Sequence, residues 1–168
     1  MATERGPGIA RRLRQAEDAL LVLAVAALVG LAALQIVLRG VFGGGILWIE
    51  PLLRSLVLWS GLLGAVVASR SGQHIAIDVL TRSLPTAWRL RVRAVACAFT
   101  ALVCAALAWH GGRYVALEYG FDGTAFADVP AWAVVAILPA AFGLIALRYA
   151  GFALAFARGR QPFGDLPA

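Results

Sequence analysis

Residues 20–38 read LLVLAVAALVGLAALQIVL, and this stretch decides the fold of the chain. Gln35 is its only polar residue. Because an α-helix rises about 1.5 Å per residue, the stretch is long enough to cross about 30 Å of bilayer hydrocarbon. It is also longer than the apolar region of a cleaved signal peptide, which has roughly 7–15 residues. We therefore predict a transmembrane helix that is retained as a signal anchor.

Three further apolar stretches have a similar length, which gives four predicted spans. We place them at residues 20–38, 47–69, 94–112 and 129–150. Each span must be helical, because a lone strand in lipid would leave its backbone groups without hydrogen-bond partners. The sequence therefore predicts an all-α integral membrane protein with four transmembrane helices, organised as a single membrane domain over residues 1–168.

The composition supports a membrane location and excludes a nucleic-acid partner. Hydrophobic residues make up 61% of the chain and charged residues 14%, against roughly 45–50% and 25% in soluble domains. The excess of apolar surface must face lipid. The net charge is +6, but the basic residues stand in short runs between apolar stretches. That pattern indicates an orientation bias rather than a basic face that binds nucleic acid.

The distribution of arginine predicts how the helices are oriented. All 15 basic residues are Arg, and most lie in the N-terminal tail, the 70–93 connection and the C-terminal end. The first and third connections carry fewer Arg and also hold Glu50, Glu118, Asp122 and Asp128. Since cytoplasmic segments are enriched in basic residues, we predict that both termini and the 70–93 connection are cytoplasmic, in a bacterial inner membrane.

The connections differ in character. The first, Arg39–Leu47, is rich in glycine and is typical of a tight, flexible turn. Within the 70–93 connection, His74–Leu84 places apolar residues on one helical face and the i,i+4 pair Asp78 and Arg82 on another. We predict a short amphipathic cytoplasmic helix that ends at Pro85.

The start of the second span carries an unusual pair of charges. Glu50 and Arg54 are four residues apart with the acid first, which is the favourable order for an ion pair on a helix. Pro51 suits the first turn of a helix. The pair either anchors a partner subunit or only positions its own helix at the membrane edge, and the sequence leaves both interpretations open.

Small residues recur along the second span. Ser60, Gly64 and Ala68 are spaced by four, as are Gly61 and Ala65. Small residues at this spacing let two helices approach closely. The approaching helix could belong to this chain or to another protein, and the sequence does not separate the two.

No group of residues in the sequence is typical of an enzyme, a metal site or a cofactor site. Arg70, His74 and Asp78 are spaced by four and would share a helical face, but a metal needs more ligands. His110 is a single intramembrane histidine, whereas a bis-histidine haem site needs a second on a facing helix. Cys97 and Cys104 are best interpreted as small packing residues.

The second span and its exit resemble a known family. In order, the residues read RxxF from Arg39, WxExxxRxxxxW from Trp48, LGA from Leu63, AxRxxxHIxxD from Ala68 and LP from Leu84. This string resembles the DctQ-like small membrane subunit of the tripartite ATP-independent periplasmic (TRAP) transporters. The family often has two consecutive acids after the tryptophan, whereas here the second position is Pro51.

The resemblance implies a role in transport. A periplasmic substrate-binding protein would capture an organic acid such as a C4-dicarboxylate. A large membrane subunit would then move it by secondary active transport on an ion gradient, usually sodium. The small subunit would be a scaffold that packs against the large one and contacts membrane lipid. The resemblance implies structural or partner-interface roles for eight positions: Trp48, Glu50, Arg54, Trp59, Gly64, Arg70, His74 and Asp78. We predict the same kind of role for Arg39, which opens the string, and for Gly61, which belongs to the repeat of small residues.

Two other functions are compatible with four spans. The chain could be the membrane anchor subunit of a redox enzyme, an interpretation based on His110 and His74. It could also be a small self-sufficient carrier, although the sequence lacks the paired interrupted segments that are typical of a transporter's own substrate site.

Overall fold

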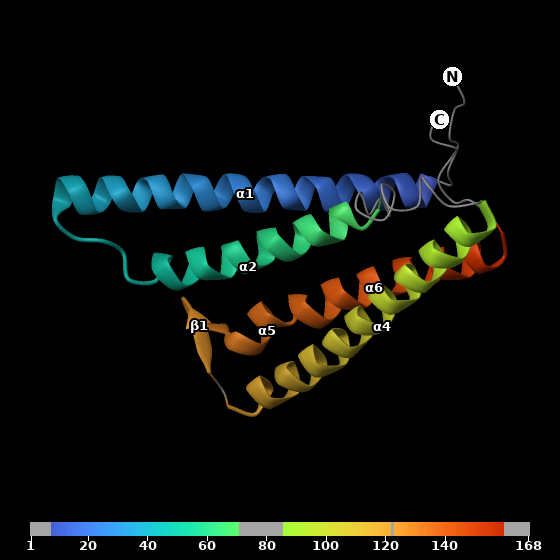
Figure 1. Ribbon diagram of the computed structural model, residues 1–168. Helices are drawn as coiled ribbons and strands as arrows, with labels where there is room; N and C mark the ends of the chain where they lie inside the picture. The colour runs from blue at the N-terminus through green and yellow to red at the C-terminus, as the bar shows by residue number, and fades with distance from the viewer. Residues whose placement is uncertain (1–7, 71–85, 122, 160–168) are drawn as a thin grey trace, which may run out of the picture. The chain divides into compact units, whose positions relative to one another are not determined.

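The computed structural model describes residues 8–70, 86–121 and 123–159 of the chain. In this part, the long helices are α1 (Gly8–Phe42), α2 (Ile49–Ala68), α4 (Thr86–Tyr119) and α6 (Ile137–Ala157), with a short helix α5 (Ala131–Val135) (Figure 1). Two short strands, β1 (Thr124–Phe126) and β2 (Val129–Pro130), precede α5. Four segments are long and apolar enough to cross a membrane: Arg11–Phe42, Ile49–Ala68, Leu90–Tyr119 and Ala131–Ala157. The predicted all-α class is confirmed, and these four segments are candidate membrane spans.

The described elements fall into two compact units. The first comprises residues 1–67 and 115–137, and the second comprises residues 68–114 and 138–168. The single membrane domain, the cytoplasmic termini and the orientation of the spans stay predictions. The predicted amphipathic helix His74–Leu84 lies outside the described residues.

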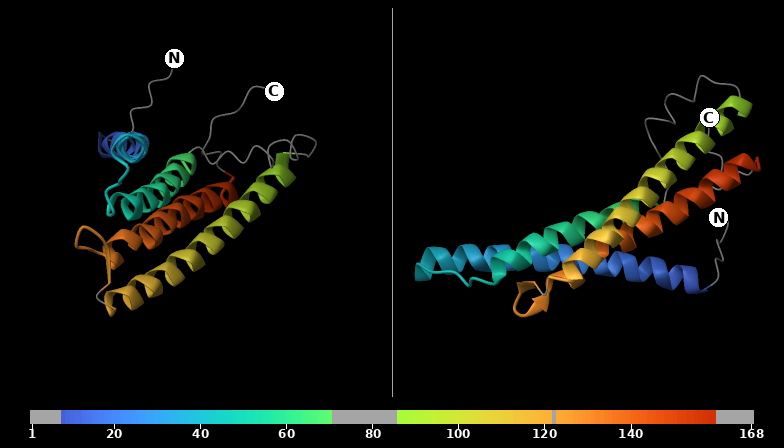
Figure 2. Two further views of the ribbon diagram at one scale, coloured as in Figure 1. Left: turned by 90° about the vertical axis from the view of Figure 1, so that its left-hand side faces the viewer. Right: turned by 90° about the horizontal axis from the view of Figure 1, so that it is seen from below.

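In the first unit, α1 and α2 run side by side in opposite directions (Figures 1 and 2). The helix α1 extends well beyond the predicted span at both ends and stops at Phe42, where Gly43 adopts a left-handed φ of 65°. Glycine takes this conformation without a steric penalty, which makes it the usual residue after a helix end. The first connection therefore starts after Phe42 and not at Arg39 as predicted, because Arg39 and Gly40 remain helical.

The predicted start of the fourth span at Val129 differs from the structure. Val129 and Pro130 form β2, which pairs antiparallel with β1, so that Phe126 lies opposite Val129. Ala127 and Asp128 join the strands with positive φ values of 43° and 62°. Pro130 keeps an extended backbone, with φ −64° and ψ 136°, and the helix begins only at the next residue.

The fourth span is also interrupted near its start. Helix α5 ends at Val135, and α6 begins at Ile137 after the single non-helical residue Ala136. Pro139 explains the interruption, because it has no N–H to donate to the carbonyl of Val135 four residues earlier, and its ring crowds that carbonyl.

In the second unit, α4 and α6 lie side by side (Figure 2). Buried residues of this unit include Cys97 and Cys104 on α4, and Ala141, Ile145 and Tyr149 on α6. The two helices approach closely at Gly111, where a Cβ atom would lie 3.3 Å from the backbone nitrogen of Pro139.

We expect Gly111→Ala to destabilise the protein relative to Gly112→Ala. The added methyl group would press on the Pro139 backbone, and overpacking of this kind costs about 1–3 kcal/mol. At Gly112 a Cβ would meet no atom within 4 Å, so the control gains helix propensity without a clash. Thermal unfolding in detergent measures the difference, and equal midpoints for the two variants would contradict the close approach.

Candidate functional site

Three charged side chains meet where α1 ends and α2 begins. Glu50 Oε1 lies 3.0 Å from Arg54 Nη2, and Glu50 Oε2 lies 3.4 Å from Arg39 Nη2. The pairing of Glu50 with Arg54 follows from their i,i+4 spacing on α2, as expected from the sequence. Arg39 joins them because it lies in the last turn of α1 and the short 43–48 connection returns the chain to α2. The sequence places Arg39 just before a glycine-rich connection that leads to Glu50, which was the available sign that the two could meet. The sequence analysis did not pair them.

The 43–48 connection packs tightly against α1 at one point. A Cβ atom on Gly45 would lie 2.7 Å from Gln35 Nε2 and 3.0 Å from Arg39 Nε. Glycine at this position therefore lets the connection approach the side chains of α1. Ile49, which opens α2, is 1% exposed and is the most buried large residue of the described chain.

The two predicted tryptophans of α2 have different environments. Trp48, just before the helix, is 46% exposed. Trp59 is half-buried, and its Nε1 donates a hydrogen bond of 2.9 Å to the carbonyl oxygen of Val134. Because Val134 lies two residues before the break at Ala136, Trp59 fixes α2 against the short helix α5.

The two predicted glycines of α2 face open space. A Cβ atom on Gly61 or on Gly64 would meet nothing within 4 Å in the part of the chain that the structure describes. Glycine is thus not required at either position for packing against those residues.

The third predicted group is only partly visible. Arg70 follows α2 in a turn and is half-buried, whereas His74 and Asp78 lie outside the described residues. The structure adds a contact that the sequence did not suggest: Arg148 Nη1 donates a hydrogen bond of 3.1 Å to Ser69 Oγ. Arg148 lies within α6.

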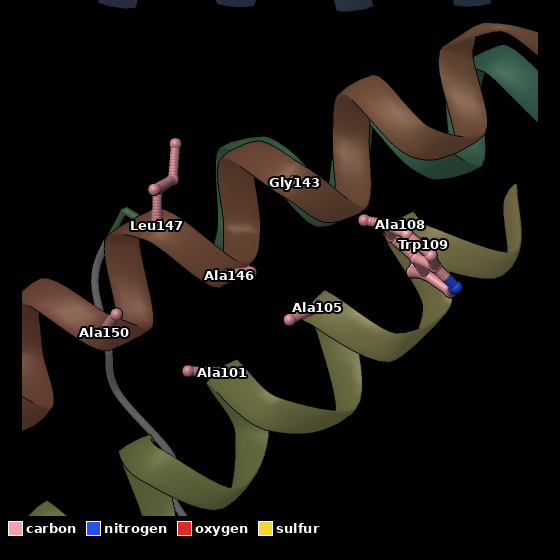
Figure 3. Close-up of a pocket in the computed structure, with 8 residues that line it drawn as sticks. All are labelled: Ala101, Ala105, Ala108, Trp109, Gly143, Ala146, Leu147 and Ala150. Carbon is pink, nitrogen blue, oxygen red and sulfur yellow. The ribbon is translucent and has the colours of Figure 1, made fainter. Parts of the chain in front are cut away.

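An apolar groove lies between α4 and α6 (Figure 3). Its volume is about 640 Å³. Most lining residues are small, and none is ionisable: Ala101, Ala105, Ala108, Trp109, Gly143, Ala146, Leu147 and Ala150. The groove could receive apolar groups, but it has no side chains for recognising a charged solute. Over residues 8–70, 86–121 and 123–159, no three His, Cys, Asp or Glu residues gather as metal ligands.

The four spans and these contacts define an integral membrane protein whose notable side chains hold helices together. Comparison with known proteins gives the family. Residues 28–159 match the family described as "Tripartite ATP-independent periplasmic transporters, DctQ component". The chain therefore belongs to the DctQ family of TRAP transporter components, and it is a permease component rather than an enzyme.

Individual relatives agree with this assignment. The chain is 29% identical over 135 residues to the "C4-dicarboxylate TRAP transporter small permease protein DctQ" of Rhodobacter capsulatus, which covers 79% of this chain and 58% of the relative. It is 30% identical over 126 residues to the "Sialic acid TRAP transporter permease protein SiaT" of Haemophilus influenzae strain 86-028NP, which covers 73% of this chain and 20% of SiaT. A putative TRAP transporter small permease protein of Haemophilus influenzae strain Rd is 35% identical over 77 residues. That match covers 46% of this chain and 48% of the relative. The matches thus span less than two thirds of each relative.

Proposed function

We propose that this chain is the scaffold subunit of a TRAP transporter and packs against a larger membrane subunit that carries the substrate. The match to SiaT carries this proposal most directly. The segment similar to this chain makes up 20% of SiaT, so in that permease it is joined covalently to a much larger remainder. We propose that this chain meets the corresponding larger part of its own transporter as a partner.

The exposed glycine face of α2 supports the same arrangement. Gly61 and Gly64 leave open space in the described chain, and small residues on a membrane helix allow another helix to approach closely. We assign this face to the large subunit. Four of the other predicted positions make contacts within the chain: Trp59 bonds to α5, and Glu50 pairs with Arg39 and Arg54.

The substrate in this proposal is an organic acid. The two relatives with named substrates belong to transporters of a C4-dicarboxylate and of sialic acid, both of which are carboxylates. A periplasmic binding protein would deliver the acid, and an ion gradient, with sodium the first to test, would drive its import across the bacterial inner membrane. The arginine distribution supports cytoplasmic termini.

Capture of partners from native membranes tests the proposal. The chain is tagged at its C-terminus, extracted in mild detergent and analysed by mass spectrometry together with whatever follows it. We expect one larger polytopic protein in stable association. Recovery of the chain alone, or with a soluble redox enzyme, would overturn the scaffold function.

Within this proposal, we expect Glu50→Ala to weaken the complex more than Glu118→Ala. Loss of Glu50 leaves Arg39 and Arg54 without their shared carboxylate, and the two guanidinium groups then repel each other where α1 meets α2. Glu118, on α4, provides the same change in charge away from this cluster. The measurement is the yield of the larger subunit in the capture experiment, and equal yields would remove the special status of Glu50.

A further inference from the structure

The charged cluster of Arg39, Glu50 and Arg54 has donors that its internal ion pairs do not use. Each guanidinium contacts Glu50 through one nitrogen, Nη2, and each takes a different carboxylate oxygen. A guanidinium carries five N–H donors in a planar fork. The side chains of Arg39 and Arg54 are 61% and 79% exposed. Glu50 therefore holds two guanidinium groups close together while most of their donors face outward.

The charge of the cluster favours an anion with a single negative charge. Two guanidinium groups and one carboxylate leave a net charge of +1. The exposed Glu50 carboxylate would repel a ligand with several negative charges, whereas a phosphodiester monoanion neutralises the cluster. Arg is well suited to this ligand, because its fork matches the oxygens of a phosphate group.

The cluster also lies at the level where such a group occurs in a membrane. Helix α2 has 20 residues, which corresponds to about 30 Å, the thickness of the hydrocarbon layer. Glu50 is its second residue, and the Arg54 side chain reaches back toward the helix start to meet it. Charged groups near a helix end extend in this way toward the headgroup region.

Apolar side chains beside the cluster complete an amphiphilic surface. Phe42 is 79% exposed and Leu47 is 92% exposed, and Trp48 adds a partly exposed indole. Tryptophan is favoured at the headgroup level of bilayers. Together with the arginines, these side chains match a ligand with a charged head and apolar chains.

We propose that Arg39 and Arg54, oriented by Glu50, bind the phosphate group of a membrane phospholipid. This site goes beyond the scaffold function and does not require the large subunit. Its occupant is a phospholipid; free phosphate and a carboxylate of a partner protein are the alternatives that the experiment separates.

The test measures phospholipid that is retained by the purified full chain in mild detergent, by mass spectrometry. Wild type is compared with Arg39→Gln/Arg54→Gln and with Arg11→Gln/Arg12→Gln, which makes the same change in charge in the first turns of α1. We expect the cluster variant to retain about tenfold less phospholipid than wild type, because it loses the charge-assisted hydrogen bonds of two guanidinium groups that Glu50 holds together. The control should retain lipid like wild type. If the double variant does not fold, the single variant Arg54→Gln repeats the test with a smaller change. It keeps the Arg39–Glu50 pair and lowers the net charge of the cluster to zero.

Three results would overturn the lipid site. The first is that the folded cluster variants retain as much phospholipid as wild type. An equal loss in the Arg11/Arg12 control would be another, because it would show a general charge effect. The third is binding of inorganic phosphate by delipidated chain, with the same dependence on the arginines, while added phosphatidylglycerol is not taken up. Capture of the larger subunit by wild type is scored separately, so failure of the lipid site is distinguishable from failure of the scaffold function. If the cluster variants keep lipid but lose the larger subunit, the arginines bind protein instead.

Discussion

Gly61→Leu/Gly64→Leu should reduce capture of the larger subunit by about tenfold or more, while the chain itself remains folded. The leucine side chains would fill the open space beside α2 and hold an approaching helix away from the backbone. Leucine is a strong helix former, and its apolar side chain is favourable in the hydrocarbon layer, so α2 alone should tolerate both changes. The yield of the larger subunit after mild-detergent capture measures the effect.

Gly30→Leu/Gly151→Leu is the matched control for this experiment. Both glycines lie on long helices, α1 and α6, and a Cβ at either would also meet nothing within 4 Å. The control should capture the larger subunit like wild type. A loss of capture in both double variants, or in neither, would mean that the glycine face of α2 has no particular role in the complex.

Trp59→Ala should lower the free energy of unfolding by about 2–4 kcal/mol, somewhat less than for a fully buried tryptophan because Trp59 is half-buried. The change removes both the indole packing and the hydrogen bond to Val134. Trp59→Phe keeps an aromatic ring but removes the donor, and we expect a loss of about 1 kcal/mol. For a chain of this size, each kcal/mol shifts the midpoint of thermal unfolding by roughly 2–4 °C.

Trp48→Ala provides the comparison for Trp59. Trp48 has the same side chain on the same segment, but it is 46% exposed. Its replacement should change the midpoint far less than Trp59→Ala. Equal shifts for the two alanine variants would show that the contact between Trp59 and Val134 does not stabilise the fold.

The parts of the fold that the sequence predicted correctly depend on local properties. The number of spans follows from the length and apolarity of each stretch, as for residues 20–38. The ion pair between Glu50 and Arg54 follows from the helical repeat. Both properties are present in a single segment and do not require knowledge of what packs against it.

The failed predictions depend on backbone conformation or on distant partners. Residues 129–135 are apolar whether they form a strand or a helix, so their composition could not reveal β2. The turn before them uses Ala127 and Asp128 at positive φ, without the glycine that usually marks such a turn.

The contacts of Trp59 with Val134 and of Ser69 with Arg148 were also missed. They join residues that are 75 and 79 positions apart. No local pattern reports such a pairing, because it arises only when the helices pack.

The buried cysteines of α4 have a practical consequence for all these comparisons. Cys97 and Cys104 are the only two cysteines of the chain, both are free, and they are 3% and 9% exposed. A thiol must be accessible to react, so a maleimide dye should label the folded protein slowly. Once α4 separates from its neighbours, the dye should label both cysteines. The native chain thus carries its own attachment sites for a dye that reports unfolding, and variants can be ranked by labelling rate without introducing a cysteine.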